Sequence, residues 1–169
     1  MREMIRSLAF AAALGACAAA HAQAKLQVQA PAAYEPDTPI TQEARAECKV
    51  ADMLAKGILD ALSPAYPGAV AVPEPAKSGP EWGVGLTIVN LHGIGSDRPQ
   101  RGLKYGHWSV KVRTDLYRDS KLVSSKSFER RSTFGQDPCE ITQKVVNVVS
   151  KDVARWVNTQ VVTSTPVAK

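Results

Sequence analysis

The sequence is short of the residues and motifs from which catalytic and cofactor sites are usually built. It has only three histidines and three cysteines among 169 residues. No glycine-rich loop leads into a Lys-Ser or Lys-Thr pair or into a third glycine, so the phosphate-loop and dinucleotide fingerprints are both absent. No apolar stretch reaches the roughly 20 residues with which a helix crosses a bilayer. We therefore expect no cofactor, no metal ion, no catalytic residue and no transmembrane span.

The first 24 residues have the three parts of a secretory signal. Arg2 and Arg6 form a positive start, and an apolar block of about 13 residues runs from Leu8 to Ala20. Two overlapping Ala-x-Ala triplets, which signal peptidase accepts, end at Ala24. This pattern predicts a signal peptide over residues 1–24 and a periplasmic or secreted mature protein.

A second interpretation of the same segment rests on its cysteine. Leu14-Gly15-Ala16-Cys17 resembles the lipobox of bacterial lipoproteins, from which it departs at Gly15. This resemblance implies an outer-membrane lipoprotein that is acylated at Cys17. We favour cleavage at the Ala-x-Ala triplets, because a lipoprotein has no need of such sites after its cysteine.

Cleavage after Ala24 leaves Cys48 and Cys139 as the cysteines of the mature chain. Exported proteins occupy compartments that oxidise thiols, so an even pair predicts a disulfide. The bridge would close a long loop, which makes it worth up to about 4 to 5 kcal/mol in the loop-entropy model.

Hydrophobic periodicity predicts a single α+β domain over residues 38–160. Residues 25–37 carry two prolines and predict an extended arm or linker, and residues 161–169 predict a flexible tail. A helix is expected from the Thr38-Pro39 cap to Leu62, with Cys48 in its middle. A second helix is expected from the Asp137-Pro138 cap, although its many valines leave a strand as the alternative.

Between the helices the period changes to two. Three strands are expected, at 82–91, 107–117 and 122–132, with a turn at Arg118–Lys121. Residues 68–72 are the candidate for a short fourth strand. The last of these strands is polar and suits a sheet edge. The predicted fold has three to four antiparallel strands with both helices on one face, joined by the disulfide.

Positive charge is concentrated in one loop and hairpin. Residues 98–131 hold ten Lys or Arg and three Asp or Glu, whereas the rest of the mature chain has nine basic and twelve acidic residues. Such a surface attracts anionic partners, and the alternative is a charged edge that only prevents aggregation. The residues that we expect to bind an anion are Arg98, Arg101, Lys104, Lys111, Arg113, Arg130 and Arg131.

His92 and His107 are the histidines that remain after cleavage, and they bracket a Gly-containing loop. His107-Trp108-Ser109 resembles the His-x-Ser element of two-histidine phosphoesterases, but His92 lacks the matching hydroxyl residue. A weak hydrolase that uses these two histidines is therefore the least favoured hypothesis.

The layout of helix, strands and helix with one disulfide resembles small exported proteins and lipoproteins of proteobacterial envelopes. We expect a non-catalytic periplasmic binding or assembly accessory whose basic residues engage an anionic envelope component or an acidic partner protein, and we expect no nucleic acid partner. The alternative is a structural subunit of an envelope complex that adds its sheet edge to a neighbour's sheet.

Overall fold

The computed structural model describes residues 25–37, 48–74, 82–95, 106–132 and 138–164. Two helices and six strands lie in these ranges, which confirms the α+β class and shows more strands than expected. The predicted signal peptide, Cys17 and the Thr38-Pro39 cap lie outside the described residues. The elements are β1 (Leu26–Gln29), β2 (Ala33–Tyr34), α2 (Val50–Leu62), β3 (Val70–Val72), β4 (Trp82–Gly95), β5 (Gly106–Arg118), β6 (Lys121–Ser132) and α3 (Pro138–Ser164).

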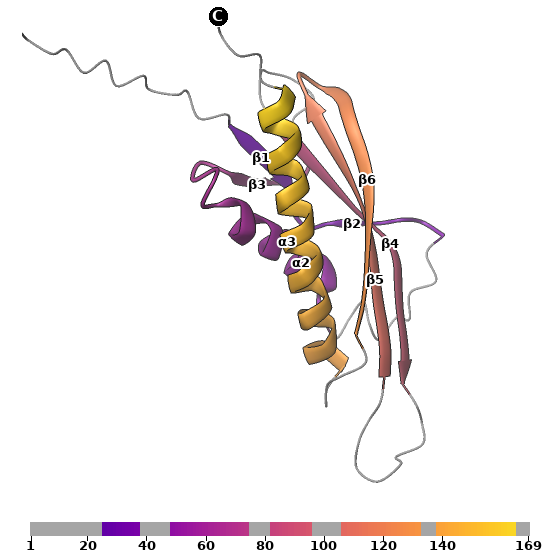
Figure 1. The fold of residues 1–169 in the computed structure, drawn as a ribbon. Helices are drawn as coiled ribbons and strands as arrows, with labels where there is room; N and C mark the ends of the chain where they lie inside the picture. Colours follow the sequence, from indigo (N-terminus) through magenta and orange to yellow (C-terminus); the bar gives the residue numbers. More distant parts are fainter. Residues whose placement is uncertain (1–24, 38–47, 75–81, 96–105, 133–137, 165–169) are drawn as a thin grey trace, which may run out of the picture.

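The strands form one mixed sheet in the order β3-β1-β4-β5-β6, with β2 also paired to β4 (Figure 1). The strands β4, β5 and β6 are antiparallel, as expected from their alternating pattern. In contrast, β1 pairs in parallel with both β3 and β4, and β2 pairs in parallel with β4. The prediction of a wholly antiparallel sheet was therefore wrong.

Residues 25–37 are extended, but they are part of the sheet rather than a separate arm. Leu26 and Val28 are fully buried in the core. The pairing of this segment with β4 is interrupted around Pro31, which has no backbone N–H to donate. Where the backbone pairing with β4 stops, the side chain of Gln29, the last residue of β1, supplies a hydrogen bond to β4 instead. Its Oε1 accepts from the Leu86 backbone N–H at 2.9 Å. A four-residue pattern that pairs in parallel with a distant strand is too short to be recognised from periodicity.

The β5–β6 hairpin turns through Asp119 and Ser120, as the sequence predicts. Both residues have positive φ, at 50° and 65°, which is the conformation of a two-residue turn that matches the twist of the flanking strands. The turn, together with a register shift between Leu116 and Tyr117, sets the pairing of β6, so that Val112 is opposite Phe128 and Val110 is opposite Arg130. The strand β6 is the last strand of the sheet order, and the prediction of a polar edge strand is confirmed.

Both helices pack against each other and cover the same face of the sheet (Figure 1). The buried positions of α3 include Val145, Val149, Val153 and Val157, which recur every four residues and lie along one side of the helix. The prediction of a helix, rather than a strand, for this valine-rich segment is therefore confirmed. It runs through Ser164, so residues 161–164 are helical rather than part of a flexible tail.

The disulfide between Cys48 and Cys139 is present, with a Cα–Cα distance of 5.1 Å. It connects Cys48, two residues before the start of α2, with Cys139 in the first turn of α3. Cys48 is helical, but the predicted helix is not continuous around it, because Lys49 has a positive φ of 44° and α2 starts at Val50. A left-handed residue interrupts a right-handed helix, so the chain changes direction immediately after the cysteine.

The two helices approach each other closely at Gly57 of α2 and Ser150 of α3. A Cβ built on Gly57 would lie 2.6 Å from the Ser150 Oγ and 3.3 Å from its Cβ. Only a residue without a side chain allows this contact, so Gly57 keeps the helix pair at its observed spacing.

Candidate binding groove between β6 and α3

The seven cations that the sequence selects for anion binding do not form one surface. Arg98, Arg101 and Lys104 lie outside the described residues. Of the others, Lys111, Arg113 and Arg131 belong to the sheet face opposite the helices, because their partners in the register alternate with the buried valines of β5. Arg130 pairs with buried Val110 and therefore lies on the helix side.

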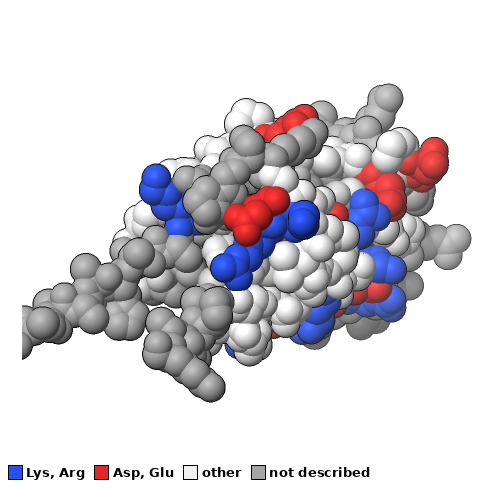
Figure 2. Space-filling view, turned by 90° about the horizontal axis from the view of Figure 1, so that it is seen from above, with Lys and Arg blue, Asp and Glu red and all other residues white. Residues whose placement is uncertain are grey.

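The arginines of this set that the structure describes are each paired with an acid. Arg113 Nη1 lies 2.9 Å from Glu35 Oε1, and its Nε lies 3.6 Å from Asp115 Oδ2. Arg131 Nη2 lies 2.6 Å from Glu129 Oε1. On the side drawn in Figure 2, acidic atoms lie beside basic atoms in several places. The positive face is thus weaker than the count of charges along the sequence suggested.

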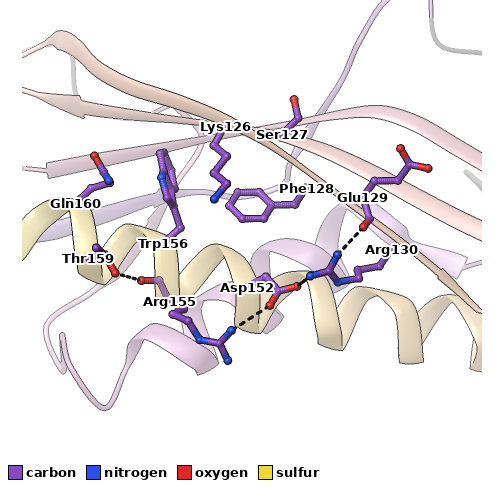
Figure 3. A pocket seen from close by; sticks show the side chains of 10 residues that line it. All are labelled: Lys126, Ser127, Phe128, Glu129, Arg130, Asp152, Arg155, Trp156, Thr159 and Gln160. Carbon is purple, nitrogen blue, oxygen red and sulfur yellow. Dashed lines mark hydrogen bonds and ion pairs between the residues drawn. The ribbon is translucent and has the colours of Figure 1, made fainter.

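A hollow of about 590 Å³ lies between β6 and α3 (Figure 3). We call it the β6–α3 groove and define it by the residues that line it. Five consecutive residues of β6 form one side, and five residues from two turns of α3 form the other. The lining residues are Lys126, Ser127, Phe128, Glu129, Arg130, Asp152, Arg155, Trp156, Thr159 and Gln160.

Two aromatic side chains form an apolar wall in the groove. Phe128 is buried and Trp156 is half-buried, and their ring centroids lie 5.9 Å apart with an interplanar angle of 65°. The ammonium group of Lys126 lies 5.3 Å from the centroid of the Phe128 ring. A cation above an aromatic face is attracted by the ring quadrupole, which holds Lys126 at the groove.

Two carboxylates line the groove, and one of them faces two guanidinium groups. Asp152 Oδ2 forms an ion pair with Arg130 Nη2, and Asp152 Oδ1 lies 3.5 Å from Arg155 Nη1 (Figure 3). The carboxylate of Glu129 pairs with Arg131 on the other side of the sheet. The three lining cations, Lys126, Arg130 and Arg155, therefore outnumber the two lining acids, which leaves the groove with a net positive charge.

Sequence reasoning identified only Arg130 of these groove residues as a site residue. Lys126 lies in the segment 122–132, which the sequence predicts as a polar edge strand. Asp152 and Arg155 gave no signal, because their relation to β6 depends on how α3 crosses the sheet rather than on local pattern.

The two histidines lie elsewhere, on β4 and β5. In the register His92 is opposite Ser109, and His107 is opposite Ile94, so the two backbone positions are diagonal neighbours. His92 is exposed. Within the described residues no group of three or more His, Cys, Asp or Glu is arranged to hold a metal ion, and neither helix is both long and apolar enough to span a membrane.

No family model and no curated protein matches the chain, whereas many solved structures resemble it. A Xanthomonas campestris protein of the DUF330 family covers 85% of this chain and 91% of its own, with 14% identity and a TM-score of 0.53. A minor lipoprotein from Acinetobacter baumannii covers 82% and 92%, at 11% identity and a TM-score of 0.40. The PelC dodecamer from Paraburkholderia phytofirmans covers 75% and 86%, at 12% identity and a TM-score of 0.42. The first of these three shows that the fold is shared with DUF330 proteins.

Proposed function

We propose that this protein is an exported, non-catalytic binding or assembly accessory of the cell envelope, and that it holds an anionic component in the β6–α3 groove. The observation that carries the proposal is one groove in which Arg130 and Arg155 face the Asp152 carboxylate and Lys126 lies over the Phe128 ring, near Trp156. Aromatic side chains and arginine supply much of the binding energy where proteins bind partners. The excess positive charge selects partners with negative charge.

Export is supported by the amino-terminal pattern of residues 1–24 and by the disulfide between Cys48 and Cys139. Disulfides persist in oxidising compartments such as the bacterial periplasm. We propose cleavage after Ala24, with acylation at Cys17 as the alternative. The intact mass of the protein recovered from its native envelope distinguishes a chain that starts at Lys25 from an acylated chain that starts at Cys17.

A binding role agrees better with the arrangement of side chains than a hydrolytic role that uses the histidines. The groove lies between β6 and α3, whereas His92 and His107 belong to β4 and β5. His92 is registered with Ser109, on the sheet face opposite the helices, so a site that combined it with Arg130 would have to draw on both faces of the sheet.

The test compares two double charge reversals in the full exported chain. Lys126→Glu/Arg155→Glu alters the groove, and Lys121→Glu/Lys151→Glu makes the same change in net charge at exposed positions outside it. Binding is measured to phosphatidylglycerol vesicles and to polyglutamate, with phosphatidylcholine vesicles as the neutral control. We expect wild-type binding to at least one anionic probe, weakening as salt rises past about 0.15 M, where the screening length is near 8 Å.

The groove variant should bind about tenfold more weakly, equivalent to about 1.4 kcal/mol, while the control variant stays close to wild type. Equal losses in the two variants would show a general charge effect without a site. Absence of wild-type binding to every anionic probe would reject the proposal.

A further inference from the structure

The edge strand β6 offers more to a partner than positive charge. It is 12 residues long, from Lys121 to Ser132, contains no proline, and pairs with β5 alone among the described strands. In such a strand every second residue directs its backbone N–H and C=O to the outer side. These outward groups have no strand partner in the described part of the chain. Such an edge is able to accept another strand through main-chain hydrogen bonds.

The β6–α3 groove follows this edge. Lys126, Phe128 and Arg130 point toward α3, whereas Ser127 and Glu129 point away from it (Figure 3). Successive side chains of a strand project to opposite faces, so a hollow lined by all five residues must reach the backbone rim of β6. An extended chain seated there would meet the strand edge on one side and Trp156 on the other.

The charge of β6 argues against a second copy of this chain as the occupant. The strand carries Lys121, Lys126, Arg130 and Arg131 against Glu129 alone. Pairing two such strands would bring like charges together, and like charges on directly opposite residues destabilise a sheet. An acidic strand would instead meet opposite charge from Lys126, Arg130 and Arg155.

We propose that an acidic, extended segment of a partner protein adds to β6 as a further strand and fills the β6–α3 groove. This inference rests on the proposed function and specifies the class of its ligand. Alternate residues of the segment face α3, where apolar side chains contact Phe128 and Trp156 and acidic ones pair with the groove cations. The remaining residues continue the opposite face of the sheet.

The experiment uses the full exported chain and a fluorescent octapeptide, Glu-Thr-Val-Thr-Glu-Thr-Val-Thr, in which Glu and Val lie on the same face of a strand. We call it the Glu-Val peptide, and the same sequence with Lys in place of Glu is the charge control. Two further Glu-Val peptides carry N-methyl groups on every second residue, in one phase or in the other. In a strand ladder the N–H groups of alternate residues point to the same neighbour. We expect one N-methyl series to lose binding by about tenfold or more and the other to bind as the parent peptide does.

Amide hydrogen exchange gives a second, independent readout. On addition of the Glu-Val peptide, alternate amides of β6 should exchange more slowly, while those of β3, at the opposite edge of the sheet, should not change. Trp156→Ala should weaken peptide binding, and Arg155→Glu should do so without any effect on the core, because Arg155 is exposed. Lys121→Glu at the turn is the matched control.

Equal binding of the two N-methyl series, or unchanged exchange in β6, would overturn strand addition. If phosphatidylglycerol vesicles still bound in a manner that depends on Lys126 and Arg155, the proposed function would stand with a lipid headgroup as its ligand. Loss of both peptide and vesicle binding would reject the proposed function together with this inference.

Discussion

The helix layer and the edge strand β6 differ in the contacts that hold their side chains. In α2 and α3 the inward positions are filled by aliphatic side chains that are almost fully buried, and a disulfide joins the two starts. In β6 only Phe128 is buried among 12 residues, and the other side chains are exposed or intermediate. Cation–acid contacts hold this strand's arginines, whereas apolar contact holds the helices.

This difference separates stability from binding. Burial of apolar surface supplies most of the favourable free energy of folding, so the helix layer should determine how stable the protein is. Exposed ion pairs contribute little to stability, so β6 is free to exchange its internal partners for those of a ligand. Substitutions in the two regions should therefore affect different measurements.

The largest expected effect is the loss of the disulfide. Cys48→Ser/Cys139→Ser should lower the free energy of unfolding by about 4 kcal/mol, because the unfolded chain is released from a cross-link with a sequence separation of 91. Urea denaturation measures the change. Leu122→Ser, at an exposed position of β6, is the control and should change stability by less than about 0.5 kcal/mol. Equal urea midpoints for the two variants would contradict the view that the helix layer, and not β6, determines stability.

A smaller effect is expected where the helices touch. Gly57→Ala should cost about 1 kcal/mol, because crowding against Ser150 outweighs the gain in helix propensity. Ser150→Ala alone should be neutral or stabilising, since its buried Oγ has no hydrogen-bond partner within the described residues. The cost of Gly57→Ala should shrink in the Ser150→Ala background. Strict additivity in a double-mutant cycle would argue against the contact.

Two neighbouring arginines allow a comparison within β6 itself. Arg130 pairs with Asp152, whose side chain is only 16% exposed, whereas Arg131 pairs with Glu129 and is 76% exposed. We expect Arg130→Ala to cost about 1 kcal/mol and Arg131→Ala less than about 0.5 kcal/mol, because solvent screens the exposed pair. Urea denaturation at low and high salt measures both. If the Arg131 variant were the less stable one, burial of Asp152 would not be the controlling factor.

The smallest effect is a dependence of stability on alkaline pH. Tyr66 is buried at the end of the helix layer, its hydroxyl donates to Asn158 Oδ1 at 3.1 Å, and burial raises its pKa above the ordinary value of 10.0. The folded state then holds the phenol proton more tightly than the unfolded state, so stability falls as pH rises above about 10. Unfolding measured on either side of that pH should show the decline. Tyr66→Phe should reduce it, and an unchanged slope would assign the decline to another group.

The parts of the fold that were predicted correctly are those encoded by neighbouring residues. The β5–β6 hairpin follows from strict alternation around Asp119-Ser120, and α3 follows from apolar residues that recur every turn. The disulfide followed from counting cysteines after cleavage. The parallel strands β1, β2 and β3 were missed or only partly expected, because each is short and gains its stability from a partner far away in sequence.

The candidate site shows the same division. Local sequence placed a cluster of cations on β5 and β6, since charge along a chain can be counted without knowing the fold. Only the tertiary structure showed that Arg130, and not Arg131, lies on the face covered by the helices, and that Arg113 pairs with Glu35. It also brought Asp152 and Trp156 to β6, because the crossing of a helix over a sheet depends on packing of the whole core. Sequence by itself thus determined the longer helices and strands and their charge, and packing decided which charges are neutralised and which line the groove.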